Sequence, residues 1–406
     1  MQQTGIFKHQ RLVGLDAWRA VLLVLGVALH AVSNPLGWEQ WVGVATHKFR
    51  MEAFFAISGL LAAFTLRQQG ASKWLARRWI SLGVPTLMVM MSLNPLTLAL
   101  QVWDQQRQLG QELTPFAFHT PILHLWFLPV LLACSTLLAS MTAWPALITR
   151  MDRAVGHLVS SATPLRRRCL IAAIMLLALA GIGLEQVYTL ITAGYEPAGR
   201  MAGLAFRDFG LTGPWIPYYF VFYLLGWLIG ARPDVAELCL HHRRVLVALV
   251  AIGVVGIVAA FWYKGRAYVF PYAFENALGG GRTFASITKA LIGVPATLLI
   301  LSHAVGVRRV PALLDRLSRS SYTIYLVHLF LLTALSAALG NRGRETMPRY
   351  LLLVLVTVAV GHQVHFLLVK RSAVLGFLLN GTGRLRDIVP LPVAQWKSGR
   401  PDRGNG

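Results

Sequence analysis

Arg19 and His30 lie eleven residues apart in one apolar segment near the start of the chain. Eleven residues are close to three helical turns, so both side chains are expected on one face, about 16 Å apart along the axis. Ionisable groups at membrane depth are costly and indicate a functional site. We predict that His30 is a general base and that Arg19 holds a phosphate or polarises a carbonyl. The structural alternative pairs Arg19 with Asp16 and bonds His30 to a neighbouring helix.

A second polar set opens the next apolar segment, at the end where His30 is expected. It contains Arg50 and Glu52, which are two residues apart and do not share a helical face. The alternative is an interfacial charge set in which the Arg50 side chain reaches toward the polar surface. His124 and Trp126 begin a later segment on the same side. These four residues are our candidates for the side that binds an acceptor.

The opposite side of the membrane carries several basic loops. Arg77 and Arg78 lie in one of them, and together with His328 they are candidates for holding a phosphate-bearing donor. A hydrogen-bonded structural role is the alternative for His328. His362 and His365 are three residues apart on one face, but no carboxylate or thiol stands at matching spacing. We therefore predict no metal site.

The elements that position these residues are transmembrane helices. The chain has 406 residues, of which 56% are hydrophobic and 13% charged, a composition typical of multispanning membrane proteins. About 20 apolar residues cross a bilayer. We therefore predict an all-α polytopic protein with about ten transmembrane helices. They lie near 15–33, 51–66, 79–100, 122–143, 169–190, 215–231, 245–263, 284–305, 321–340 and 350–369.

The net charge of +22 is distributed unevenly. Of the 38 lysines and arginines, 26 lie in the two termini and the even-numbered connections when Arg19, at the start of the first segment, is counted with the N-terminus. By the positive-inside rule, this asymmetry predicts that both termini are cytoplasmic. The chain has no RNP, zinc-finger or helix-turn-helix pattern, so we expect a lipid bilayer as partner and no nucleic acid.

The chain is predicted to contain one transmembrane domain, residues 1–379. Residues 380–406 are polar and rich in glycine and proline, and are predicted to be a mobile cytoplasmic tail. Cys134 and Cys169 fall in or at spans and Cys239 in an inner loop, so no structural disulfide is expected.

Several motifs in order resemble the integral-membrane acyltransferase family 3. They cover about 310 residues, and the Arg50-Met51 and His-Leu-Trp-Phe-Leu stretches look closest to the branch with the periplasmic-glucan succinyltransferase. The matching stretches are Arg19-x10-His30, Phe54-Phe55-x-x-Ser58-Gly59, the basic loop before Pro85, His124–Leu128, Tyr219–Gly226 and Ser321–His328.

The resemblance implies an enzyme of the bacterial inner membrane that moves an acyl group to a hydroxyl of a periplasmic glucan or other envelope glycan. The donor would be cytoplasmic succinyl-CoA or acetyl-CoA, with no permanently bound cofactor. The family's arginine and histidine map onto Arg19 and His30, with His30 as general base or acyl carrier. The chain departs from the family at Ser81, where a second arginine often follows the one matched by Arg78.

Two other functions fit ten spans with buried arginine and histidine. One is a proton-coupled transporter or flippase of an envelope precursor, which does no chemistry. Interrupted spans in matching positions of two halves would have supported that function, and we find no such symmetry. The other is a structural subunit of a complex that makes an envelope glycan.

Overall fold

The computed structural model describes residues 13–32, 38, 40–109, 122–160, 215–265, 280–340 and 346–382, with a few single residues between 168 and 183. The described part is helical. It contains eight helices long and apolar enough to span a membrane, and a shorter apolar helix, Ile216–Ala231. These correspond to nine of the predicted segments, whereas the segment 169–190 and the tail beyond Thr382 lie outside the described residues. The cytoplasmic placement of the termini stays a prediction.

The helix bounds follow the apolar segments with local differences. The third predicted segment begins earlier than expected, because α4 (Ala71–Arg78) continues through the π-helix η2 (Trp79–Gly83) into α5 (Val84–Met91). The remaining elements are α1 (Val13–His30), α2 (Gln40–His47), α3 (Arg50–Gln69), α6 (Leu93–Leu109), η3 (Leu123–Trp126), α7 (Phe127–Thr142), α8 (Pro145–Ser160), α11 (Trp215–Ala231), α12 (Pro233–His241), α13 (Arg243–Lys264), α15 (Gly280–Gly306), α16 (Ala312–Leu339), α17 (Met347–Val364), η5 (His365–Val369) and α18 (Ala373–Asn380).

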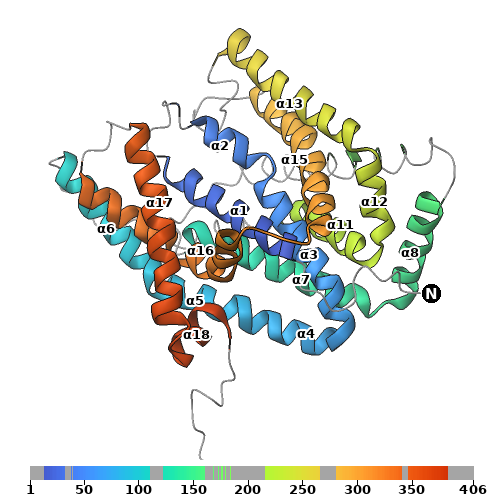
Figure 1. Cartoon of the computed structure of the whole chain (residues 1–406), viewed down its shortest axis with the longest axis horizontal. Helices are drawn as coiled ribbons and strands as arrows, with labels where there is room; N and C mark the ends of the chain where they lie inside the picture. The colour runs from blue at the N-terminus through green and yellow to red at the C-terminus, as the bar shows by residue number, and fades with distance from the viewer. Residues whose placement is uncertain are drawn as a thin grey trace, which may run out of the picture.

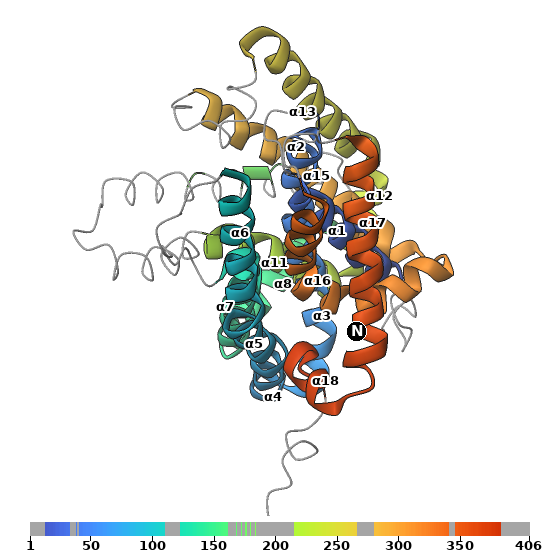
Figure 2. The same ribbon diagram turned by 90° about the vertical axis from the view of Figure 1, so that its left-hand side faces the viewer.

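Figures 1 and 2 both place α4 and α18 at one end of the molecule and α2 toward the opposite end. Helix α1 packs against α16, α15, α3 and α17 and so lies among other helices. Helix α13 instead carries exposed Val255 and Trp262, as expected of a helix that faces lipid.

Helices α3 and α11 approach until their backbones touch. A Cβ atom added at Gly59 would collide with the carbonyl oxygen of Tyr223, and one added at Gly226 with that of Ala56. Gly226 and Gly230 form a G-x-x-x-G pair, a pattern that lets membrane helices pack closely. On the adjoining surface, Phe55 stacks on Tyr219 with ring centres 4.4 Å apart. This contact holds α3, and with it Arg50, in a fixed position.

Replacement of Gly226 by leucine is expected to destabilise the fold by about 2 kcal/mol or more, because backbone atoms have no room to yield. The measurement is the thermal midpoint of the detergent-purified protein, followed by size-exclusion chromatography. Gly256→Leu is the control, since nothing lies within 4 Å of an added Cβ there. An unchanged midpoint for Gly226→Leu would contradict the close approach of α3 and α11.

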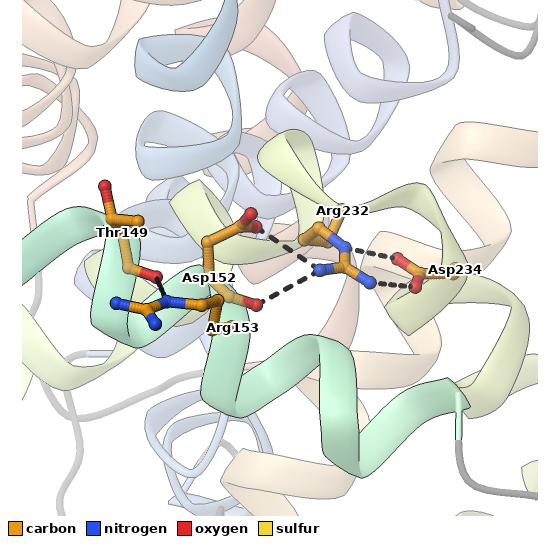
Figure 3. Close-up of polar contacts among 5 residues, drawn as sticks. All are labelled: Thr149, Asp152, Arg153, Arg232 and Asp234. Carbon is orange, nitrogen blue, oxygen red and sulfur yellow. Dashed lines mark hydrogen bonds and ion pairs between the residues drawn. The ribbon is translucent and has the colours of Figure 1, made fainter. Parts of the chain in front are cut away.

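Arg232 joins α8 to the turn between α11 and α12 (Figure 3). Its guanidinium donates to both carboxylate oxygens of Asp234, at 3.1 and 2.7 Å, and to the side chain and carbonyl oxygen of Asp152 in α8. The hydrogen bonds to Asp234, and then those to Asp152, raise the pKa of Arg232 above its usual value. In α12, burial raises the pKa of the Cys239 thiol to about 11. Cys134 is also a buried free thiol, and Cys169 lies outside the described residues.

Candidate active site between helices α1 and α16

Three histidines from distant parts of the chain form one cluster. His30 ends α1, His124 lies in η3 and His328 lies in α16. The ring centre of His328 is 5.2 Å from that of His30 and 4.8 Å from that of His124. The His30 and His124 ring centres are 6.5 Å apart. Three imidazoles at this spacing can accept and pass on a proton.

The backbone of Tyr325 determines which nitrogens of two histidines are free. Its carbonyl oxygen lies 2.7 Å from Nδ1 of His328 and 3.2 Å from Nε2 of His124. A carbonyl only accepts, so both of these nitrogens carry hydrogen, and in a neutral ring the other nitrogen is an acceptor. Those nitrogens, Nε2 of His328 and Nδ1 of His124, are buried and have no hydrogen-bond partner among the described residues. They are therefore available to a bound molecule or to His30.

The short helix that carries His124 is held from two sides. Leu123 adopts a left-handed conformation with φ of 44°, which is unfavourable for a leucine. The Asn94 side chain donates to the carbonyl oxygen of Ile122 at 3.3 Å, and the Tyr325 hydroxyl donates to that of His124 at 2.8 Å. Surrounding contacts thus maintain a strained turn immediately before His124, a feature that clusters at functional sites.

Arg50 brings a buried positive charge to the histidine cluster. It is 8% exposed, and its Nη1 atom fills the space where a side chain at Gly26 would stand. Gly26 precedes His30 by about one helical turn, and Arg50 and His30 lie within electrostatic range of each other. Arg50 makes no hydrogen bond or close ion pair with the described residues, and its Nε atom is buried without a partner. A guanidinium in this setting is suited to bind a negatively charged oxygen.

A cavity of about 250 Å³ adjoins His30, whose side chain is exposed to it. Its wall comes from the end of α1 and from α6, α16 and α17. The lining residues are His30, Ala31, Val32, Gln101, Leu329, Leu332, Thr333, Ser336 and Leu353. The cavity gives a small molecule access to the exposed member of the histidine cluster.

Glu52 faces away from the histidines into a separate buried network. Its Oε1 atom accepts a hydrogen bond of 2.8 Å from the Tyr218 hydroxyl and lies 3.6 Å from Nζ of Lys289. That Nζ atom stands 4.2 Å from the centre of the Tyr218 ring. Glu52 is completely buried, so this network links α3, α11 and α15. These contacts connect three helices, and a role of Glu52 on the acceptor side stays a prediction.

A second cationic group lies about three turns along α1. Arg19 makes a 3.8 Å ion pair with Asp16 and lies within electrostatic range of Arg78 and Tyr322. The Arg78 guanidinium carbon stands 5.5 Å from the centre of the Trp74 ring, and the Tyr322 hydroxyl donates to the carbonyl oxygen of Ser81 at 3.1 Å. With Arg19 36% exposed, this group can meet a phosphate from outside the helices.

The structure groups the predicted site residues differently from the sequence. His124 and Arg50 lie with His30 as expected, but His328 lies with them too, and not with Arg78. Arg77 is exposed, and Trp126 packs against Tyr219, with ring centres 5.6 Å apart.

Sequence reasoning missed several residues around the site. Lys289 had a usable signal, since it is a lysine inside an apolar segment, the criterion that singled out Arg19. Tyr325 carried no signal beyond its place three residues before His328. Gln101 and Thr333 are neutral polar residues in helices, and nothing in their spacing indicated a cavity.

Comparison with known proteins gives one broad match and several partial ones. A family described as an acyltransferase domain, acyltransferase family 3, matches residues 12–361. Glucans biosynthesis protein C of Salmonella paratyphi B is 26% identical over 148 residues, which are 32% of this chain and 38% of that protein. The same figures hold for Glucans biosynthesis protein C of Salmonella heidelberg. The match thus spans well under half the length of these relatives, and no solved structure matches the chain.

Proposed function

Since the chain belongs to the membrane acyltransferase family 3, we propose that it transfers an acyl group from acyl-CoA to a hydroxyl of an envelope glycan. The partial similarity to Glucans biosynthesis protein C supports a glucan as acceptor. We place the protein in the bacterial inner membrane, with the Arg19 end toward the cytoplasm. Succinyl-CoA or acetyl-CoA is the proposed donor.

One observation carries the chemical part of this proposal: His30 opens onto a cavity and stands beside His124, His328 and the buried Arg50. A sugar hydroxyl is a weak nucleophile until a base removes its proton. Attack on a thioester carbonyl places negative charge on the carbonyl oxygen, which needs a nearby positive group. His30 supplies the base and Arg50 the positive group.

In the proposed reaction, the acceptor hydroxyl loses its proton to His30 as its oxygen bonds to the thioester carbonyl carbon. Arg50 binds the oxygen that becomes negative. The carbon–sulfur bond then breaks, the acyl group remains on the acceptor as an ester, and CoA leaves as a thiolate that takes the proton from His30. Direct transfer of this kind needs no covalent acyl-enzyme. The alternative mechanism is transfer through a covalent intermediate in which His30 itself carries the acyl group.

Arg19 and Arg78 are proposed to bind the phosphates of CoA. Arg19 lies about three helical turns before His30 on α1, and Arg78 of α4 is within electrostatic range of Arg19. An extended pantetheine arm can bridge this distance. This assignment separates the two substrates, because the donor enters beside α4 and the acceptor from the end where α2 lies. With Arg19 bound to phosphate, the residue proposed to stabilise the carbonyl oxygen is Arg50, which is closer to His30 than Arg19 is.

The experiment is mass spectrometry of envelope glycans from cells that contain or lack this chain, with purified protein in nanodiscs assayed in parallel with acyl-CoA. Loss of an ester-linked mass without the chain would support the proposal, and that mass would distinguish succinyl from acetyl. Glycans of unchanged mass, together with no consumption of either thioester by the purified protein, would overturn it in favour of transport.

A further inference from the structure

We propose that the cavity beside His30 is a subsite for a neutral, hydroxyl-bearing unit of the acceptor, about the size of one sugar ring. The inference rests on the proposed acyl transfer to a hydroxyl. It differs from the acceptor site expected from sequence, because Arg50, Glu52, His124 and Trp126 do not line this cavity.

Among the described residues that line the cavity, none carries a fixed charge. His30 is the one ionisable residue of this set, and the others are aliphatic or neutral polar side chains. Leu329, Leu332, Thr333 and Ser336 come from one face of α16, since their spacing follows successive helical turns. An anionic ligand would find no cation among the described lining residues, so this lining favours an uncharged one.

Three neutral polar side chains line this space. Gln101 comes from α6, and Thr333 and Ser336 come from α16. None of the three has a hydrogen bond to another described residue, although nearby serines and threonines bond to their own helix. Thr333 is only 6% exposed, but its hydroxyl is not among the buried atoms that lack a partner, so it is open to a molecule in the cavity.

The chemistry of these groups fits hydroxyls. A hydroxyl or an amide side chain both donates and accepts, which is what a sugar hydroxyl also does. The leucines offer apolar contact to the carbon-bound faces of such a ring. An acyl chain of the donor is a poorer fit, because an apolar chain would leave Gln101, Thr333 and Ser336 unpaired. The free carboxylate of a succinyl group would meet no cation among the described lining residues.

Size and position agree with one sugar unit beside the base. A volume of 250 Å³ equals about eight water molecules at roughly 30 Å³ each. It lies below the range of about 300–1,000 Å³ typical of pockets for larger ligands. The cavity is lined by Ala31 and Val32, which lie beyond His30 on the side away from Arg19. A ring held there can present a hydroxyl to His30 while the rest of the glycan extends outward.

The test is a steady-state assay in nanodiscs with acyl-CoA and neutral glucose oligosaccharides, in which the concentration of each substrate is varied. Thr333→Val removes the hydroxyl and keeps the shape. We expect it to raise the KM for the oligosaccharide about 3- to 10-fold and to leave the KM for acyl-CoA unchanged. Thr333→Ser should restore the wild-type value. Thr136→Val is the matched control, because the Thr136 hydroxyl bonds to its own helix in α7.

A second variant fills the cavity. Ser336→Phe should prevent transfer to the oligosaccharide while CoA still binds with wild-type affinity in calorimetry. A changed KM or chain-length preference for acyl-CoA in either variant would assign the cavity to the acyl group and overturn the inference. Transfer by the wild type to charged acceptors alone would overturn it as well. No transfer by the wild type to any glycan would instead reject the proposed function, so the two failures are distinguishable.

Discussion

His30→Ala is expected to lower kcat for acyl transfer by at least about 100-fold, the contribution of a positioned general base. The acceptor hydroxyl would keep its proton, because the acceptor nitrogens of His124 and His328 stand behind His30 rather than in the cavity wall. The measurement is single-turnover formation of the glycan ester in nanodiscs. CoA affinity should be unchanged, since Arg19 and Arg78 lie about three helical turns away.

The control for this variant is His157→Ala, which removes an exposed imidazole of α8 far from the cluster along the chain. Transfer at the wild-type rate by His30→Ala would reject His30 as the base and make His328 the next candidate. Incubation with the acyl-CoA donor alone distinguishes direct transfer from transfer through an acyl group on His30. An acyl adduct on His30, detected by peptide mass spectrometry, would indicate an acyl-enzyme, and its absence with full activity would indicate direct transfer.

Arg50→Gln is expected to lower kcat about 100- to 1,000-fold, the effect of removing one oxyanion donor. The same change should leave the thermal midpoint equal or raise it. Arg50 is a buried cation without a hydrogen bond to the described residues, so its removal relieves a desolvation cost and breaks no hydrogen bond or ion pair with them. Loss of activity together with unchanged or higher stability is the signature of a group kept for function.

Arg50→Lys keeps the charge but not the planar fork of the guanidinium, and should retain part of the lost rate. Gly26→Ala provides an independent check, because the added methyl would displace the Arg50 side chain without removing it. A fall in kcat in Gly26→Ala, with the protein still folded, would link the position of Arg50 to the reaction. A marked drop in the thermal midpoint of Arg50→Gln would instead indicate a structural role.

The sequence alone predicted the helical membrane architecture and one pair of polar residues. A long apolar segment can adopt few structures in lipid other than a helix, because every backbone hydrogen bond must be made within the segment. That constraint is local, so nine of the ten predicted segments were found in the described part of the chain. The helical period likewise placed Arg19 and His30 on one side of α1, since both lie in one continuous helix.

Only the tertiary structure decided which helices meet. His30, His124 and His328 come from segments that are far apart in the chain, and a periodic pattern says which face of a helix is polar but not which helix it faces. The contact of the Arg50 guanidinium with Gly26 of α1 places Arg50 near His30, and the carbonyl of Tyr325 bonds to one ring nitrogen of each of two histidines. The cavity beside His30 exists because α1, α6, α16 and α17 leave a space that their side chains do not fill, a property of packing that no single segment encodes.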